Sequence, residues 1–395
     1  MNGLALTGGT PVRTRPWPAW PVWGEEEEAQ LLDVLHSGVW GGYSPQVAKF
    51  ERVFATTVGT QHCVSMANGT VTLVAALRAL GVRPGIEVIV PTYTFFSTAS
   101  AVVLAGGTPV FADMEPDTWN MDLGHAESLI TSDTLVIVPV HFAGLPVDLD
   151  RLLPMAQRHG LKVLEDAAHA LGSTWRGRQV GTFGALASFS FQAAKNVTGG
   201  EGGALVTDDD ALCERVWSIG NLGRRRGGDW YVHDEPAANY RMTGWSAAVL
   251  NAQLGRLDDQ VEARMAAGGY LREQLAGSGL VPAAWDARAE RHAHHLLPLR
   301  YLPEEFGWLP VEQFARALVA EGVPVALGYP MPLNRQPAFG GRLGECPVAD
   351  AVCASSLWLS QWMLLADRAD LDDITEAVHK IRTHASSHSS TPMRS

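Results

Sequence analysis

Short apolar segments and helix-like segments alternate along the chain from Gly24 onward, and this alternation restricts the fold more than any other feature of the sequence. The segments LVIVPV (135–140) and LKVL (161–164) are almost continuously apolar, which is typical of strands covered on both faces. Two further strands are predicted at 62–66 and 86–90, and helical patterns at 71–80 and 148–159 lie between the strands. A strand–helix–strand order predicts an α/β fold with a mostly parallel central sheet and helices on both sides.

A second part of the chain follows a long helical pattern that runs from Trp245 to about Leu275. That helix is long enough to link two domains. After it, the patterns of a strand (293–301), a helix (311–321) and a strand (323–327) predict a smaller α+β domain. We therefore expect a large domain over residues 1–255 and a small domain over 256–395, with a disordered tail from about residue 383.

The first residues form a segment of their own. Gly8–Trp23 contains four prolines and three tryptophans, and prolines at this density predict an extended arm. Tryptophan side chains favour burial, so the arm should pack on its own chain or on a second subunit. The sequence leaves both possibilities open.

Composition excludes several classes of protein. With 30 Lys+Arg against 42 Asp+Glu, the formal net charge is −12, which argues against nucleic acid as the main partner. No segment reaches the roughly 18 consecutive apolar residues of a membrane span. The first residues lack the pattern of a secretory signal, and the four cysteines form no CxxC pair. We expect a cytoplasmic enzyme without a membrane partner.

Candidate site residues follow the predicted strands, because ligands of open parallel sheets gather beyond the carboxyl ends of the strands. Gly69 and Thr70 open a helix whose amides suit a phosphate, although such a turn also serves simple capping. Asp166 ends a covered strand, where a carboxylate needs a cation or else caps the next turn. Ser190 could donate to a phosphate. The aromatic side chains in 92–96 could stack on a ring or belong to the core.

Lys195 stands between apolar residues and the glycine-rich segment 199–203. A lysine in such surroundings can lose its proton and attack a carbonyl, although a solvated loop lysine is the ordinary alternative. Together these residues offer a lysine for an aldehyde, a carboxylate for a ring nitrogen, donors for a phosphate and an aromatic face. That set matches pyridoxal 5′-phosphate. The nucleotide-binding patterns GxxxxGK[ST] and GxGxxG are absent from the sequence.

The segments EDAAH (165–169), 189–203 and NYRMT (239–243) resemble the DegT/DnrJ/StrS family of aminotransferases, and the resemblance extends from Gly8 to about Ile381. It implies the aspartate aminotransferase-like fold of type I pyridoxal-phosphate enzymes. It also implies that Lys195 forms the Schiff base to the cofactor and moves the proton of the amino donor. Asp166 would hold the ring nitrogen protonated.

The resemblance assigns further residues to the cofactor. Phe95 would stack on its ring, and Gly69, Thr70 and Ser190 would bind its phosphate. Asn239 would reach the phosphate of a neighbouring subunit, so a homodimer with shared sites is expected. His169 stands near the expected 3-hydroxyl, where many family members have glutamine, and this exchange leaves that contact open.

Within the family the chain is most similar to the branch of 3-amino-5-hydroxybenzoate synthase and the glutamine:scyllo-inosose aminotransferases, on segments such as PVHFAGL (139–145). The resemblance implies amino transfer from glutamine or glutamate to a ketone of a cyclitol or sugar in antibiotic-type metabolism. Two alternatives stay open. One is a dehydratase or aromatising enzyme like the benzoate synthase, and the other is a non-catalytic sensor with this fold.

Two further motifs have both an ordinary structural interpretation and a functional one. Arg224, Arg225 and Arg226 form a basic loop that could bind a carboxylate or phosphate, or could simply be solvated. His292, His294 and His295 lack an acidic or cysteine partner, and alternate residues of a strand point to opposite faces. We therefore predict no metal site.

Overall fold

The computed structural model describes residues 3–341 and 344–389. Within these residues a seven-stranded sheet forms the centre of the first part, in the order β1-β9-β8-β5-β4-β2-β3. β9 runs antiparallel to both of its neighbours, and the remaining neighbours are parallel, so the predicted mostly parallel sheet is confirmed. The strands are β1 (His62–Met66), β2 (Glu87–Pro91), β3 (Thr108–Ala112), β4 (Thr134–Ile137), β5 (Lys162–Asp166), β8 (Leu186–Ser190) and β9 (Gly203–Thr207).

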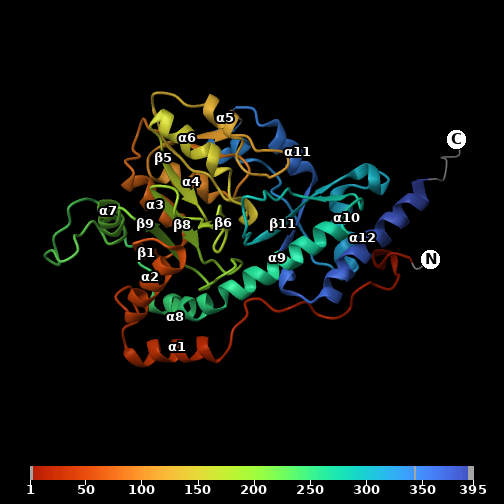
Figure 1. Ribbon diagram of the computed structural model, residues 1–395, viewed down its shortest axis with the longest axis horizontal. Helices are drawn as coiled ribbons and strands as arrows, with labels where there is room; N and C mark the ends of the chain where they lie inside the picture. The colour runs from red at the N-terminus through yellow and green to blue at the C-terminus, as the bar shows by residue number, and fades with distance from the viewer. Residues whose placement is uncertain (1–2, 342–343, 390–395) are drawn as a thin grey trace.

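Helices cover both faces of this sheet (Figure 1). The side chains of Val88, Ile89 and Val90 in β2 are all fully buried, as the continuous apolar patterns predict for strands between two helical layers. One layer consists of α3 (Gly69–Ala79), α4 (Ser97–Leu104) and α7 (Asp210–Gly220). The other consists of α2 (Pro45–Val58), α5 (Leu123–Ser128), α6 (Leu149–His159) and α8 (Gly244–Gln253).

One predicted strand is shorter than expected. The apolar segment 135–140 suggested a strand to Val140, but β4 ends at Ile137. Pro139 has no amide hydrogen and cannot continue the ladder on its donor side. Val140 pairs again with Asp166 through a single parallel bridge, so the chain stays beside β5 as it approaches the carboxyl edge of the sheet.

The second part of the chain contains an antiparallel four-stranded sheet in the order β10-β11-β13-β12. With its helices it confirms the smaller α+β unit. The strands predicted at 293–301 and 323–327 begin later, at Leu296 and Ala326. The elements are β10 (Leu280–Pro282), β11 (Leu296–Tyr301), α10 (Val311–Ala320), β12 (Ala326–Leu327), α11 (Pro347–Ser355), β13 (Ser356–Ser360) and α12 (Arg368–Ser389).

The predicted linking helix is two helices. α8 ends at Gln253, a 3-10 turn spans Leu254–Arg256, and α9 (Leu257–Gln274) then runs from the first sheet to the second (Figure 1). The boundary that we placed at residue 255 falls within this turn, and we retain the division into 1–255 and 256–395 as a proposal.

The N-terminal arm packs on its own chain. Trp17 donates from its indole to the carbonyl oxygen of Gly322 (2.8 Å), and Trp20 donates to that of Ala193 (2.8 Å). The guanidinium of Arg13 pairs with Asp370 and Asp373 of α12 (2.6 and 2.8 Å). The arm therefore runs beneath the second part before it reaches helix α1 (Glu25–Ser37).

The expectation of a disordered tail from about residue 383 is wrong for residues 383–389, which continue α12. Val378 and Ile381 are fully buried in the second core, and Ala385 packs against it. Because helix propagation is cooperative, this anchored stretch stabilises the turn that follows it. Residues 390–395 of the predicted tail lie outside the described residues.

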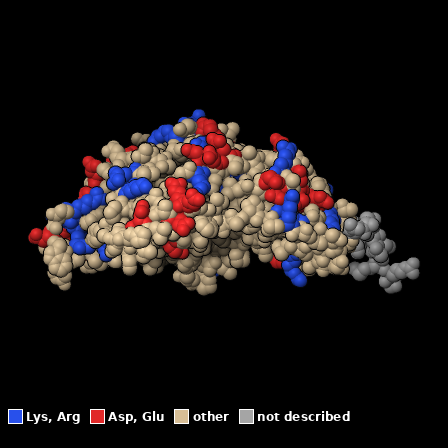
Figure 2. Space-filling model, turned by 90° about the horizontal axis from the view of Figure 1, so that it is seen from below, with Lys and Arg blue, Asp and Glu red and all other residues tan. Residues whose placement is uncertain are grey.

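Charged side chains of both signs are interspersed on the underside of the molecule, with broad uncharged areas between them (Figure 2). The net charge of −12 is thus not gathered into one acidic face on this side. Among the described residues, no helix is both long enough and apolar enough to cross a bilayer.

Candidate functional site

A cavity of about 730 Å³ lies at the carboxyl edge of the central sheet. It collects residues at or just after the ends of five strands, β1, β2, β4, β5 and β8. Seven of the eight predicted site residues line it: Gly69, Thr70, Phe95, Asp166, His169, Ser190 and Lys195. The eighth, Asn239, does not line the cavity; it is exposed, and its side-chain oxygen accepts a hydrogen bond from the amide of Arg241 (3.2 Å).

The start of α3 forms one end of the cavity. The side chain of Asn68 caps this helix by accepting from the amide of Val71 (3.0 Å), which leaves the amides of Gly69 and Thr70, at the first two helical positions, without intrahelical partners. A Cβ at Gly69 would lie 2.8 Å from Cβ of Ser190. Only glycine lets β8 bring the Ser190 hydroxyl so close to the helix N-terminus. Two amides, two hydroxyls and the helix dipole suit a phosphate.

Asp166 ends β5 on the face that packs against α4. Its carboxylate accepts hydrogen bonds from the Thr98 hydroxyl (2.8 Å) and the Ala168 amide (3.2 Å). Burial raises the pKa of Asp166, and these two bonds with the nearby Lys195 charge offset only part of that effect. A buried carboxylate without an ion-pair partner within hydrogen-bond distance favours a cationic ligand group.

Lys195 lies beyond β8, in a short turn whose amide at Lys195 donates to the carbonyl of Gln192 (2.8 Å). Among the described residues its ammonium group makes no hydrogen bond, and burial lowers its pKa from 10.5 to about 8. The negative charge of Asp166 works in the opposite direction. At neutral pH an appreciable fraction of the side chain is therefore an uncharged amine, which is the nucleophilic form.

His169 presents a defined hydrogen to the cavity. Its Nδ1 accepts from the amide of Ala143 (3.3 Å), so the neutral ring carries its hydrogen on Nε2. Burial and the charge of Lys195 lower the pKa of His169 well below its usual value, which favours that neutral form. The imidazole can thus donate one hydrogen bond, as the glutamine of other family members could.

The aromatic segment after β2 divides between core and cavity. Tyr93 is buried, and its hydroxyl lies 3.0 Å from that of Ser356. Phe95 lines the cavity and is 59% exposed, which leaves a ring face free for a flat ligand. The two interpretations left open for this segment therefore apply to different residues of it.

Sequence reasoning missed the support beneath the site. Glu165, adjacent to Asp166 but on the opposite face of β5, accepts from the amides of Gly181 and Gly184 (2.9 and 2.7 Å) and pairs with His141 (3.1 Å). Burial works to raise the pKa of Glu165, but these hydrogen bonds outweigh it and lower the pKa. They tie β5 to the loop before β8. The alternation of side chains along a strand was the signal that could have placed Glu165 on the face opposite Asp166.

Sequence reasoning also missed the far wall of the cavity, which comes from the second sheet. The lining residues there are His295, Leu296, Tyr329 and Trp358. His295 belongs to the histidine cluster that we considered only for metal. His292 and His294 stack at 3.7 Å between ring centroids, whereas His295 faces the other way and lies 4.3 Å from the ring of His169.

The arginine loop is held by its own chain. Arg224 donates to the hydroxyl of Tyr43 (2.8 Å), Arg225 pairs with Asp234, and Arg226 pairs with Glu214 (3.1 Å). None of the three arginines lines the cavity.

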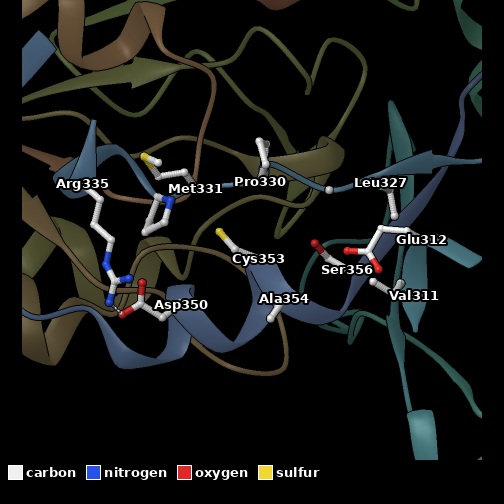
Figure 3. Close-up of a pocket in the computed structure, with 12 residues that line it drawn as sticks. Val311, Glu312, Leu327, Pro330, Met331, Arg335, Asp350, Cys353, Ala354 and Ser356 are labelled. Atoms are coloured by element: carbon white, nitrogen blue, oxygen red, sulfur yellow. Dashed lines mark hydrogen bonds and ion pairs between the residues drawn. The ribbon is translucent and has the colours of Figure 1, made fainter. Parts of the chain in front are cut away.

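A smaller cavity of about 340 Å³ adjoins the first, and Figure 3 shows residues that line it. Gly328 and Pro330 line it, whereas Tyr329 between them lines the first cavity, so this segment is the wall between the two. Its polar groups include Arg335 and Asp350, which pair with each other at one end (Figure 3). No predicted site residue lines it.

Comparison with known proteins identifies the group to which the chain belongs. The model of the DegT/DnrJ/EryC1/StrS aminotransferase family matches residues 21–379. The chain belongs to this family. An L-glutamine:2-deoxy-scyllo-inosose aminotransferase of Micromonospora echinospora is 36% identical over 96% of this chain and 98% of its own length. The 3-amino-5-hydroxybenzoate synthase of Amycolatopsis mediterranei is 36% identical over 92% of this chain and 96% of its own length.

A solved structure supports the same assignment. The crystal structure of a 3-amino-5-hydroxybenzoic acid synthase matches 94% of this chain and all of its own with a TM-score of 0.88, at 34% identity. The predicted family and the type I fold are thus confirmed, and the chain is an aminotransferase.

Pyridoxal 5′-phosphate is the cofactor of this DegT/DnrJ/EryC1/StrS aminotransferase. The residues present fit it. Within the described part of the chain, the buried carboxylate of Asp166 has no cation at hydrogen-bond distance, and the two amides at the start of α3 have no partner, which suits an anion. An uncharged amine at Lys195 suits an aldehyde.

Proposed function

We propose that this aminotransferase moves an amino group from glutamine or glutamate to a ketone of a cyclitol or sugar, in the biosynthesis of an aminoglycoside-type antibiotic. One observation carries the chemical part of the proposal: a buried lysine with a lowered pKa shares one cavity with a buried carboxylate and a helix N-terminus. The names of similar proteins support the substrate class, because several are glutamine:scyllo-inosose aminotransferases.

When bound, pyridoxal phosphate supplies an aldehyde for the amino group and a ring that stores an electron pair. The residues of the chain divide the remaining work. Gly69, Thr70 and Ser190 would hold the phosphate, and Asp166 would keep its negative charge opposite the ring nitrogen. At Nζ, Lys195 would take the proton from the α-carbon of the donor and return it to the former aldehyde carbon of the cofactor, on the other side of the transferred nitrogen. The low pKa of Lys195 suits both directions of that transfer.

The direct test adds L-glutamine or L-glutamate to the purified holoenzyme and follows its visible absorption. We expect the band of the lysine-bound cofactor to bleach as the amino group is taken up. Lys195→Ala should lower the rate of this half-reaction by about 10²- to 10⁴-fold, the usual contribution of a general acid–base group. A variant that bleaches at an undiminished rate would refute the role of Lys195.

The ketone is then chosen by experiment. The aminated enzyme is mixed with scyllo-inosose, a keto-sugar nucleotide or aminodehydroshikimate, and recovery of the visible band identifies the acceptor. The third compound tests the alternative of a dehydratase or aromatising enzyme, which the similarity to 3-amino-5-hydroxybenzoate synthase favours. Conversion of that compound to an aromatic amine, without recovery by the other two, would select the alternative.

A homodimer with shared sites is part of the proposal. Trp23 (70% exposed) and the α1 residues Leu32 and Leu35 (44 and 48%) leave an apolar surface uncovered. A largely apolar hollow of about 660 Å³ adjoins it and includes Ala193 and Gly200, close in sequence to Lys195. A second copy on this surface would bury it and enclose the cofactor cavity from that side. Asn239 would then serve the partner's cofactor phosphate, and we propose a cytoplasmic location for the dimer.

A further inference from the structure

The cofactor and the ketone need different walls of the cavity. The residues assigned to pyridoxal phosphate all come from the first part of the chain, at the edge of the central sheet. The opposite wall carries Tyr329, Trp358 and His295 from the second sheet and its loops. The atoms Nε1 of Trp358 and Nε2 of His295 make no hydrogen bond within the described residues, and neither is fully enclosed. These polar tips therefore face the open cavity.

The hydrogen bond with Asn196 shows which ring nitrogen of His295 carries the hydrogen. Asn196, the residue after Lys195, donates from its amide nitrogen to the carbonyl of Ala293 (2.6 Å). That bond orients the amide, so its oxygen is the atom that faces Nδ1 of His295 (3.1 Å). A carboxamide oxygen only accepts, hence Nδ1 carries the hydrogen and Nε2 keeps a lone pair.

The rings of His169 and His295, which lie side by side at a tilt of 32°, thus present opposite groups to the same cavity. His169 offers a hydrogen on Nε2, and His295 offers a lone pair on Nε2, with 4.3 Å between the ring centroids. Both rings are buried, so a ligand that left either Nε2 atom without a hydrogen bond would bind with a less favourable free energy. A lone pair here needs a ligand hydroxyl or amine.

We infer that His295 is a specificity-determining residue that accepts a hydrogen bond from a hydroxyl next to the reacting carbonyl of the ketone, and that Asn196 positions it. The inference rests on the proposed function and narrows its substrate class to ketones with a neighbouring hydroxyl. Tyr329 and Trp358 supply the aromatic surface on which the carbon face of such a ring can pack.

The test uses two ketones that differ by one hydroxyl, 2-hydroxycyclohexanone and cyclohexanone, with the enzyme aminated by L-glutamine beforehand. The wild type should show at least about a tenfold higher kcat/KM for the hydroxyketone, the size of one buried hydrogen bond. His295→Phe keeps a ring beside His169 but removes the lone pair, and should abolish most of the preference for the hydroxyketone. His295→Gln, which restores an acceptor at similar reach, should recover part of it. His379→Phe, on the exposed surface of α12, serves as the control and should leave the ratio unchanged.

Equilibrium binding gives a second readout that needs no turnover. Calorimetry should detect scyllo-inositol, which has hydroxyls but no carbonyl, bound to the holoenzyme about tenfold more tightly in the wild type than in His295→Phe. A wild type that treats both ketones alike would overturn the inference without any variant. So would a Gln variant as poor as the Phe variant in both assays. If bleaching by L-glutamine fails as well, the proposed function itself has failed; normal bleaching confines the failure to His295.

Discussion

At the scale of single residues, Lys195 and Asp166 are two buried groups whose pKa values both move toward the neutral form. Each influences the other, because the carboxylate favours the ammonium and the ammonium favours the carboxylate. Without the cofactor, burial disfavours the charged form of both groups. A protonated ring nitrogen and an aldehyde would relieve the two costs together, which gives a physical reason for this pair to recognise one ligand.

The lowered pKa of Lys195 leads to a pH prediction for the cofactor-free protein. Acetylation of Lys195 by trace acetic anhydride, read by mass spectrometry of its peptide, should rise with a midpoint near pH 8. Free N-acetyl-lysine amide in the same tube gives the reference, whose midpoint lies near 10.4. Asp166→Asn removes the charge that favours the ammonium and should move the midpoint below that of the wild type. A midpoint equal to that of the reference would contradict the burial of this amine.

The same shift has a definite effect on stability. Below pH 8 Lys195 is protonated in the folded and the unfolded chain, and burial of its charge destabilises the fold. Between about 8 and its ordinary value, the unfolded chain binds more protons, so this residue makes stability rise with pH. Urea unfolding of the cofactor-free protein should therefore show Lys195→Met more stable than the wild type at pH 7. The difference should shrink by pH 10.

At the scale of elements, the N-terminus of α3 depends on a close approach of β8. The strand ends in Ser190, and the helix begins with Gly69 directly against it. The hydroxyl of Thr70 lies 2.8 Å from that of Ser97 at the start of α4, so two helix starts meet at this end of the cavity. The site is therefore built from element ends held together by the packing of whole helices on the sheet.

Gly69→Ala tests this packing. The added Cβ would lie 2.8 Å from Cβ of Ser190 and 3.2 Å from its hydroxyl, so α3 or β8 must shift. Loss of one or two charged hydrogen bonds to the phosphate should weaken cofactor binding by about ten- to a hundredfold in an absorbance titration. Gly269→Ala in α9 is the control, because its Cβ would enter open space. It should stabilise the protein by about 0.5–1 kcal/mol without changing cofactor affinity. If both variants bound the cofactor as tightly as the wild type, this would argue against binding of the phosphate at the start of α3.

At the scale of the whole molecule, the cavity lies between two sheets joined by α9, and one side of it borders the uncovered apolar surface around α1. Covering the apolar side chains of Leu32 and Leu35 with a second copy would be favourable, because it removes apolar surface from water. Assembly and catalysis are thus expected to depend on each other.

If the proposed dimer forms through this surface, Leu32→Asp combined with Leu35→Asp should produce a monomer in sedimentation velocity and weaken cofactor binding. Val319→Asp is a matched control, because Val319 is 55% exposed on α10 of the second part, away from α1 (Figure 1). A wild type that sediments as a monomer would contradict the dimer.

Shared sites make a further distinction possible. The Lys195→Ala and Asn239→Ala variants should each have low activity alone. A mixture of the two, after their subunits have exchanged, should recover up to about one quarter of the wild-type activity. Half of the randomly formed dimers would then contain both variants, and each of these would have one intact site of two. Absence of recovery in an exchanged mixture would count against a contribution of Asn239 to the neighbouring site.

The residues that the sequence revealed have one property in common: each stands within a few positions of the end of a strand. Asp166, Ser190 and Lys195 could be predicted because parallel strands bring their carboxyl ends to one edge, whatever the details of packing. The strand over 62–66 followed likewise from local pattern and agrees with the structure. The tail after Thr383 could not be judged locally, since its helix depends on burial of Ile381 in a distant core.

The sequence by itself determined the α/β fold and the family, and it predicted that a lysine, a carboxylate and a glycine meet at one edge of the sheet, because strand period and short motifs are local. Only the tertiary structure decided that His295 lies beside His169 in the cavity that Lys195 lines, that Thr98 donates to Asp166, and that Glu165 anchors β5. The physical reason is distance along the chain. Asn196 and His295 are separated by 99 residues and Tyr93 and Ser356 by 263, and such contacts arise from the packing of two sheets that no local pattern encodes.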